Sequence, residues 1–383
     1  MKKLILILVP LLLVSLLAAI EFEYDGEFRT RAAIYNDQYE NDGGHVDSRL
    51  RLGMATQLYP LLSLYAQLQF GDVIWGALST YPYNDKTGYG GGIPTSVDIS
   101  AYQMYIDYRI NAIQSNVRVG QQYWADNMGL IIDDSFSGVM LNMDNLAGFK
   151  TNFGWIKAQE LNLVNNDDYN YFLVNMQAAK PLPWGVFASY GHSELNKYST
   201  LTLMPFAEVA AGPLDLKANV FAGMHFNNPA DDEFGLGAAV KANAELGPLQ
   251  VGGDLLFATE NGIETLSPYY QNGLYIYGFG KHHDGLNLYW DSPYDYPNDK
   301  SVLSLVGNLS FPLCDKSKVF GAAGLVVDSG FEVNAGIEYQ VIPDLMLLSG
   351  YGAYGIGADS GSENKSGSDA NNYLFGTTLM VTF

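Results

Sequence analysis

Two arms near the N-terminus, 22–34 and 48–58, alternate between apolar and polar side chains at every second position. Successive side chains of a β-strand point to opposite faces of a sheet, so this pattern predicts a hairpin with one apolar and one charged face. The apolar face of the first arm comprises Phe22, Tyr24, Gly26, Phe28, Thr30, Ala32 and Ile34. The charged face of that arm comprises Glu23, Asp25, Glu27, Arg29 and Arg31. A soluble sandwich would alternate in the same way, so the rest of the chain has to show which face meets water.

Segments with the same alternation recur as far as the last residue. We expect further strands near 62–71, 98–110, 115–124, 137–144, 149–163, 170–180, 185–193, 198–210, 214–226, 234–246, 249–259, 301–311, 318–328, 330–341, 345–356 and 372–383. With the opening pair they make about eighteen strands, an even number like that of closed outer-membrane barrels. No segment shows a convincing amphipathic helix pattern.

The connections between these segments alternate between two kinds. One kind is short and mostly contains proline, which fixes φ and marks a turn. The short connections are centred on Pro60, Ala112, Pro183, Gly212, Pro248, Pro312 and Pro343. The longer, polar connections are 36–46, 72–97, 125–136, 164–168, 227–233, 260–300 and 358–371. Short turns at one rim and long loops at the other are typical of the periplasmic and extracellular ends of a transmembrane β-barrel.

The last strand supports a closed barrel. Its apolar positions alternate from Tyr373 to Phe383, and a terminal aromatic residue of this kind resembles the signal that barrel-insertion machinery recognises. Every backbone group in hydrocarbon needs an internal partner, so a membrane sheet has to close. Pairing 372–383 with 22–35 would remove both sheet edges. We therefore expect a closed antiparallel transmembrane β-barrel.

The N-terminus indicates export. Lys2 and Lys3 precede an apolar run from 4 to 17 and a small-residue exit at Ala18-Ala19, the pattern of a secretory signal peptide. We expect cleavage after Ala19, which leaves residues 20–383 as the barrel. The expected location is the outer membrane of a Gram-negative cell.

Composition narrows the function further. The chain has 41 acidic and 20 basic residues, a net charge of −21, which argues against nucleic acid as a partner. Only 16% of residues are charged, whereas Gly (41) and Tyr (27) are abundant, as suits a sheet with lipid on one face and water on the other. The lone Cys314 excludes a disulfide framework within the chain.

The arginines are concentrated in the first third of the chain. Six candidates for a pore lining all precede residue 119 and share the polar strand faces: Arg29, Arg31, Arg49, Arg51, Arg109 and Arg118. A hairpin centred near Asn41 would place Arg31 opposite Arg51. Two interpretations stay open. The arginines form a selectivity wall for anionic groups, or neighbouring acids such as Glu27 and Asp47 neutralise them.

Two long connections could narrow the lumen. The first, 125–136, has an apolar centre and three acids that could face the arginines across a constriction: Asp126, Asp133 and Asp134. A solvated acidic loop is the alternative. The second, 260–300, holds nine aromatic residues. They could stack on sugar rings, but we expect this loop to pack against itself.

No catalytic, cofactor or metal site is predicted. His192, Ser193 and Glu194 are consecutive, so their side chains diverge in a strand and cannot form a triad. The pair His282-His283 lacks further metal ligands, and the acidic runs lack the spacing of a calcium loop.

Four motifs in the N-terminal third carry a resemblance to a known family: Ser48-Arg49-Leu50-Arg51-Leu52-Gly53, Tyr65-Ala66-Gln67-Leu68-Gln69-Phe70-Gly71-Asp72 with Trp75-Gly76, Arg118-Val119-Gly120-Gln121-Gln122, and Leu130-Ile131-Ile132-Asp133-Asp134 with Ser137-Gly138. With these motifs the chain resembles alginate-export-type outer-membrane porins. The resemblance implies an eighteen-stranded barrel with an arginine-lined pore for anionic polysaccharide or small solutes. The chain departs from that family after Arg118, where basic lumenal residues become rare.

The function expected from the sequence is passive diffusion of small hydrophilic solutes, including anionic sugars or polysaccharide. The expected partners are outer-membrane lipid and lipopolysaccharide, the insertion machinery and the solutes themselves. Whether the protein forms a homo-oligomer stays open, because lipid-facing and subunit-facing apolar surfaces look alike in the sequence. One alternative is a structural or adhesive barrel whose acidic loops bridge divalent cations. A less favoured alternative is an outer-membrane hydrolase.

Overall fold

A computed structural model describes residues 21–36, 42–75, 99–159, 168–178, 183–195, 197–227, 232–278, 300–357 and 371–383. The expected signal peptide, 1–19, lies outside these residues, as do His282-His283 and most of the aromatic residues of the 260–300 connection. Within the described chain, regular structure is β apart from one 3-10 turn, η1 (Asn111–Ile113). No helix there is both long and apolar enough to cross a membrane.

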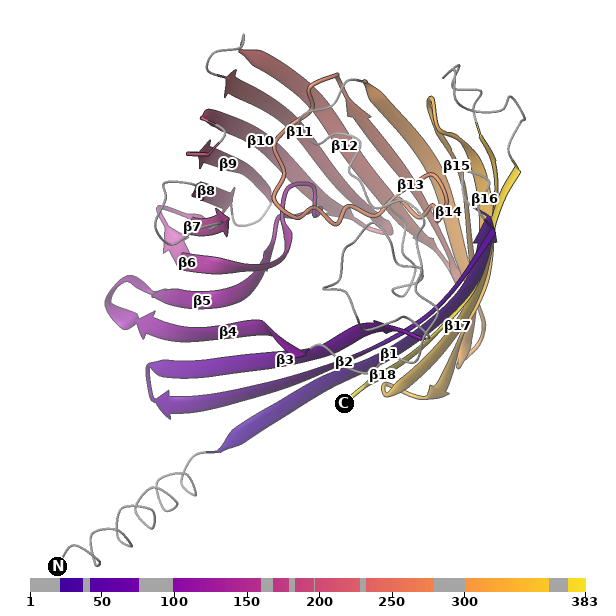
Figure 1. Cartoon of the computed structure of the whole chain (residues 1–383), viewed down its shortest axis with the longest axis horizontal. Coiled ribbons are helices and arrows are strands. Elements are labelled where there is room, and N and C mark those ends of the chain that lie inside the picture. The colour runs from indigo at the N-terminus through magenta and orange to yellow at the C-terminus, as the bar shows by residue number, and fades with distance from the viewer. Residues whose placement is uncertain are drawn as a thin grey trace, which may run out of the picture.

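The described chain forms one sheet of eighteen strands (Figure 1). Their bounds are β1 (Phe22–Asn36), β2 (Asp42–Tyr59), β3 (Leu62–Ile74), β4 (Ile99–Ile110), β5 (Ser115–Ala125), β6 (Asp133–Leu146), β7 (Phe149–Gln159), β8 (Tyr169–Ala178), β9 (Trp184–Ser193), β10 (Tyr198–Ala211), β11 (Leu214–Asn227), β12 (Glu233–Leu246), β13 (Leu249–Ala258), β14 (Val302–Cys314), β15 (Ser317–Val326), β16 (Gly330–Ile342), β17 (Met346–Gly357) and β18 (Asn371–Thr382). Each strand pairs antiparallel with the next, and β18 pairs with β1, so the sheet closes into a barrel.

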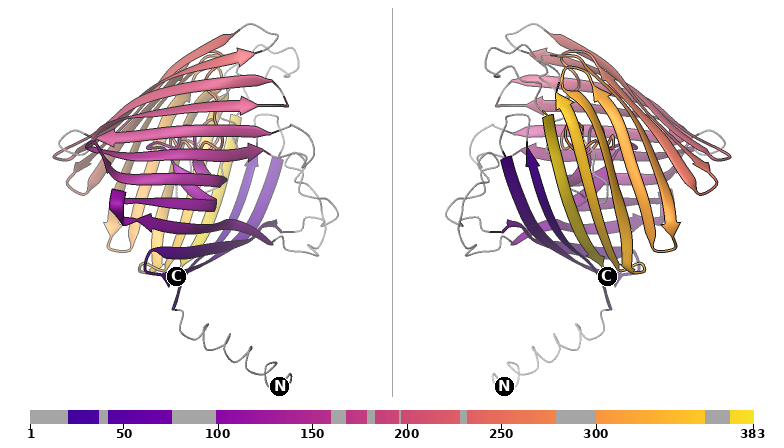
Figure 2. Two further views of the ribbon diagram at one scale, coloured as in Figure 1. Left: turned by 90° about the vertical axis from the view of Figure 1, so that its left-hand side faces the viewer. Right: turned by 90° about the vertical axis from the view of Figure 1, so that its right-hand side faces the viewer.

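The predicted strands and closure are confirmed. Residues 373–382 of β18 pair with 27–36 of β1, and two backbone hydrogen bonds between Gly26 and Phe383, of 2.7 and 3.0 Å, extend this seam. Tight turns line one rim of the barrel (Figure 2), among them the turn at Gly212, whose φ of 61° suits glycine.

One predicted turn is wrong. β14 continues through Pro312 to Cys314, and the turn follows at 315–316. The pairing of β14 with β15 is irregular between Pro312 and Cys314. Proline has no N–H to donate to the ladder, so it is tolerated where such an irregularity interrupts the pairing.

The strands carry their apolar face outward and their polar face inward. On β14, Leu303 and Leu305 are exposed, whereas Ser304 and Val306 are buried. Exposed aromatic residues gather near both ends of the strands, with Tyr59 and Trp184 close to the short turns and Tyr354 and Phe375 close to the other rim. This distribution is typical of a barrel with lipid outside and water inside.

Two connections lie inside the barrel and are called the inward segments: 126–132, between β5 and β6, and 260–278, after β13. Figure 1 shows both within the ring of strands. Leu130 and Ile131 of the first are completely buried, as are Ile263 and Leu274 of the second. Their side chains form one apolar cluster with inward residues of the strands, including Phe221. The inward segments therefore narrow the lumen.

Candidate functional site

Four arginines of the opening hairpin form an arginine ladder on the inner wall: Arg29 and Arg31 on β1, Arg49 and Arg51 on β2. Arg29 pairs across the strands with Arg49, and the rungs on either side are Glu27–Arg51 and Arg31–Asp47. The predicted pairing of Arg31 with Arg51 is wrong by a shift of four residues. Such a shift keeps every side chain on its face and places a carboxylate opposite a guanidinium in both outer rungs.

The middle rung, Arg29–Arg49, brings two positive charges together, and each reaches diagonally to an acid. Arg49 Nη2 lies 2.6 Å from Glu27 Oε1, and Arg29 Nη2 lies 3.6 Å from Asp47 Oδ1. Asp47 also accepts hydrogen bonds from Arg31 Nε and Nη2, at 3.0 and 2.8 Å. Among the described side chains, Asp47 thus contacts both Arg29 and Arg31, and Glu27 contacts Arg49.

Arg51, the fourth arginine of the ladder, contacts Gln69 and Tyr102 and is linked through Tyr102 to Asp134 of β6. Its Nε donates to Gln69 Oε1 at 2.8 Å, and its Cζ lies 3.7 Å from the ring centroid of Tyr102. The Tyr102 hydroxyl donates to Asp134 at 3.1 Å. Asp134 is thereby linked to the ladder through an aromatic ring rather than directly.

The two remaining arginines lie on β4 and β5. Arg118 donates to Asp107 at 2.8 Å, and its guanidinium lies 4.2 Å from the ring centroid of Tyr105. The exposed side chain of Arg109 makes no hydrogen bond or ion pair with the described residues and lines a cavity of about 320 Å³ near the short turns, together with Asp144. Neutralisation by acids is therefore strong at Arg31, Arg49 and Arg118 and incomplete across the set.

The first inward segment is organised around Asp126. Its carboxylate is nearly buried and accepts four backbone N–H groups, from Met128, Leu130, Ile131 and Ile132, at 2.7–3.1 Å. Burial raises the pKa of the Asp126 carboxyl, and the four N–H donors oppose that rise. The expectation that Asp126 faces the arginines is wrong, because its oxygens turn to the backbone of its own loop.

The other two predicted loop acids begin β6. Asp133 accepts a hydrogen bond from the Tyr123 hydroxyl, and Asp134 accepts one from Ser267 at 2.9 Å. Because β6 starts at Asp133, the loop is shorter than the predicted 125–136. The two acids therefore tie the loop to β5 and to the second inward segment.

The two inward segments are joined to each other. Ile132 and Ser267 form a parallel β-bridge. Tyr269 N donates to Gly129 O at 2.9 Å, and Asp133 N donates to Ser267 O at 2.8 Å. The pair forms a single inner structure, so the position of one segment depends on the other.

The second inward segment is fastened to the barrel wall by Glu332 of β16. This fully buried carboxylate accepts the backbone N–H groups of Tyr275, Ile276 and Tyr277 at 2.8, 2.8 and 3.2 Å. The Tyr277 hydroxyl accepts a hydrogen bond from Asn372 at 2.6 Å, and burial raises the pKa of that hydroxyl.

The aromatic rings of this segment also contact the wall. Tyr275 stacks on Tyr351 of β17, with centroids 4.9 Å apart, and the Tyr270 hydroxyl donates to Asp254 of β13 at 2.8 Å. The prediction that this loop packs against itself is therefore wrong for 260–278. The sequence showed Glu332 as a lumenal acid through the alternation of β16, but nothing local revealed its distant partners.

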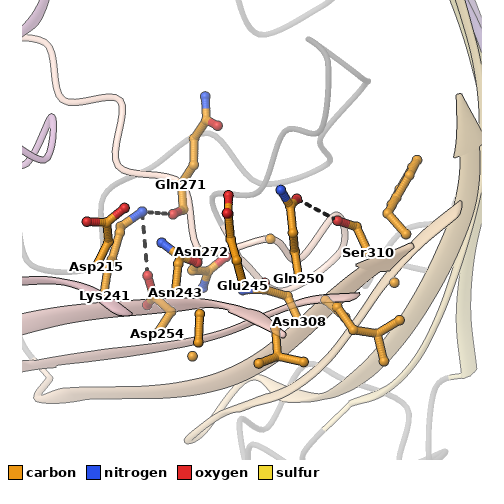
Figure 3. Close-up of a pocket in the computed structure, with 18 of the residues that line it drawn as sticks. Asp215, Lys241, Asn243, Glu245, Gln250, Asp254, Gln271, Asn272, Asn308 and Ser310 are labelled. Carbon is orange, nitrogen blue, oxygen red and sulfur yellow. Dashed lines mark hydrogen bonds and ion pairs between the residues drawn. The ribbon is translucent and has the colours of Figure 1, made fainter. Parts of the chain in front are cut away.

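Two lysines, on β11 and β12, also hold the inward segments. Lys217 of β11 donates to the backbone oxygen of Asn127 at 3.0 Å. Lys241 of β12 donates to the backbone oxygen of Gln271 and lies 3.5 Å from Asp254 (Figure 3). Each inward segment thus accepts a hydrogen bond, at a backbone oxygen, from a different lysine.

His192 and Ser193 lie on opposite faces of β9. His192 faces outward and lies 2.9 Å from the Ser199 hydroxyl, whereas its neighbour Ser193 is buried on the inner face. No group of three or more His, Cys, Asp or Glu side chains in the described residues is placed to hold a metal ion.

Comparison with known proteins identifies the fold. The outer membrane protein OpdK of Pseudomonas aeruginosa matches with a TM-score of 0.61 at 13% identity, over 94% of this chain and 99% of that one. A structure of OpdK with vanillate (0.61, 14%, 94% and 98%) and OccAB1 of Acinetobacter baumannii (0.61, 12%, 94% and 97%) match equally well. The sequence matches no protein-family model and no curated protein sequence. These similar structures support the barrel fold. They do not support the assignment to alginate-export-type porins.

Proposed function

We propose that this protein is an outer-membrane channel through which small hydrophilic solutes diffuse passively, with a preference for solutes that carry an anionic group. The observation that carries the proposal is the arginine ladder, which places four guanidinium groups on neighbouring rungs of the inner wall. A barrel of eighteen strands is wide enough for an aqueous lumen. The inward segments narrow that lumen, so a passing solute comes close to the wall.

Guanidinium groups suit the recognition of anions. Their planar N–H donors match the two oxygens of a carboxylate, and they stay charged at any physiological pH. OpdK, which is similar to this chain in fold, has been crystallised with vanillate, a carboxylate. Anionic sugars and polysaccharide, which the N-terminal resemblance suggests, belong to the same chemical class.

Planar-bilayer recording tests this function. The purified barrel should give stepwise ion currents, and its reversal potential in a KCl gradient should show anion preference. Arg51→Gln removes a ladder charge, so it should shift the reversal potential toward cation preference. The matched control is Lys157→Gln, because Lys157 pairs with Asp168 near the rim on the outer face. A folded barrel that gives no ion current would contradict the proposal and favour a structural or adhesive role.

The proposed setting follows from the same fold. The apolar outer face would contact lipid and lipopolysaccharide, and the strand ending in Phe383 would engage the insertion machinery. A homo-oligomer would cover part of that apolar face. The proposed roles of Asp133 and Asp134 are to hold the constriction in place, through Tyr123, Tyr102 and Ser267.

A further inference from the structure

A cavity of about 540 Å³ lies in the inner wall over β11–β16, beneath the second inward segment (Figure 3). It adjoins a second cavity of about 640 Å³, and the two share Asp215, Lys241, Asn243 and Gln271. The arginine ladder lies on β1 and β2, and the nearest strand of the cavity, β16, is three strand steps from β1 in the closed ring. The cavity and the ladder share no residue, so one can be changed without the other.

The floor of this cavity is a cross-strand row built around a glycine. Asp215 of β11 pairs with Asn243 of β12, Asn243 with Gly252 of β13, and Gly252 with Asn308 of β14. A Cβ atom at Gly252 would lie 2.5 Å from Asn243 Oδ1 and 2.9 Å from Asn308 Nδ2. The missing side chain thus lets two carboxamides converge from neighbouring strands over a flat floor.

The polar groups around this floor have hydrogen-bonding capacity to spare. Within the described chain, the side chains of Asp215, Asn243, Glu245 and Asn308 make no hydrogen bond or ion pair, although all four line the cavity. The two lysines of the cavity are engaged elsewhere. Lys241 binds Asp254 and the Gln271 backbone, and Lys318 lies 3.5 Å from Glu338.

We propose that this cavity is a binding site for the neutral, hydroxyl-rich part of a solute, such as a sugar ring or a polyol. A hydroxyl group both donates and accepts hydrogen bonds. The cavity offers carboxylates, which only accept hydrogen bonds, and carboxamides, which both donate and accept them. Neighbouring strands lie about 4.8 Å apart, so the row presents its groups at intervals that adjacent hydroxyls of a sugar can span.

Other ligand classes fit the cavity less well. An ammonium group has only donors and would leave the amide N–H groups of Asn243 and Asn308 without an acceptor. An anion would meet Asp215 and Glu245, which make no ion pair within the described residues. The inference rests on the proposed function only in that a solute has to enter the lumen; it does not require the arginine ladder.

The test uses the full-length barrel in planar bilayers, with sucrose added on the side of the short turns. Sucrose should interrupt the ion current more than a polyethylene glycol of equal mass, which excludes volume but lacks hydroxyls along its length. The double variant Asn243→Ala/Asn308→Ala should weaken sucrose binding about tenfold or more, because it removes two hydrogen-bonding groups. Arg51→Gln should leave sucrose binding unchanged.

Gly252→Ala provides a second variant, since its methyl group should push both carboxamides aside and cause a similar loss. Its matched control is Gly307→Ala on the outer face of β14, where a Cβ has open space. A barrel without ion current overturns the proposed channel. If the barrel conducts but sucrose interrupts the current no more than the polyethylene glycol does, the hydroxyl site alone is overturned. Block of the current by lysine and not by sucrose would overturn it as well.

Discussion

Lys217 and Lys241 lie directly opposite each other on β11 and β12, and each donates a hydrogen bond to a backbone oxygen of a different inward segment. Like charges on facing positions of a sheet repel each other. Here the backbone oxygens of Asn127 and Gln271, together with Asp254 beside Lys241, compensate for that repulsion. One strand pair therefore sets the position of both segments that narrow the lumen.

Replacing Lys241 should loosen the constriction. Lys241→Met removes the hydrogen bond to Gln271, the ion pair with Asp254 and the contact with the Tyr270 ring. We expect a larger single-channel conductance and a loss of stability below the about 3–5 kcal/mol of a fully buried pair, because Lys241 is 24% exposed. Single-channel recording and thermal unfolding measure both effects.

Lys318→Met is the matched control for Lys241→Met. Lys318 lines the same cavity and pairs with Glu338 at the same 3.5 Å, but among the described residues it contacts neither inward segment. The conductance of the Lys318→Met variant should equal that of the parent protein. Equal conductance in the Lys241 variant would show that the constriction does not depend on this lysine.

Glu332→Gln should release the second inward segment locally. The carboxylate accepts three backbone N–H groups, and the neutral amide offers a single, weaker acceptor oxygen. We expect amide hydrogen exchange at 275–277 to accelerate by about tenfold or more, as befits the loss of about 1.5–3 kcal/mol from hydrogen bonds to a charged group. Glu338→Gln should leave exchange in this segment unchanged, and slow exchange in both variants would contradict the anchoring role.

Asp47→Asn should increase anion preference at a cost in stability. Asp47 is 1% exposed and pairs with Arg29 and Arg31, so its loss removes a negative charge from the ladder. Removing one partner of a buried pair costs about 3–5 kcal/mol. The reversal potential should move further toward anions, whereas movement toward cations would show that the ladder does not face the permeation path.

Asp126→Ala should unfold the first inward segment within an intact barrel. Four backbone N–H groups lose their acceptor, and each one left unsatisfied in a buried site costs about 1–3 kcal/mol. We expect hydrogen exchange at 128–132 to rise sharply and the open-channel current to become noisier. Unchanged protection at these amides would mean that contacts with 266–269 suffice to hold the loop.

The strands could be predicted from the sequence because their signal is local. Residues two positions apart in a strand share a face, so Leu303 and Leu305 indicate the outer face of β14 without knowledge of the rest of the fold. The register of the first hairpin could not be predicted in this way. Moving Arg31 from Arg51 to Asp47 changes no side chain's face, so the alternation is the same for both pairings.

The inner structure was only partly visible in the sequence. The apolar triplet Leu130-Ile131-Ile132 within a loop indicated an inward fold, and it is buried. The acids were harder to interpret, because their partners are either backbone groups or distant residues. Glu332 binds Tyr275 across 57 positions, and no spacing rule relates two such residues. Pairing of this kind becomes visible only once the barrel has closed.

The anchor at Glu332 has a consequence for how such a channel can diverge in evolution. Glu332 binds the N–H groups of 275–277, which every residue except proline supplies, so this attachment does not depend on which side chains stand at these positions. The same holds at Gln271, whose backbone oxygen accepts a hydrogen bond from Lys241. Selection could thus replace the chemistry displayed in the lumen, one residue at a time, without rebuilding the supports that hold it there.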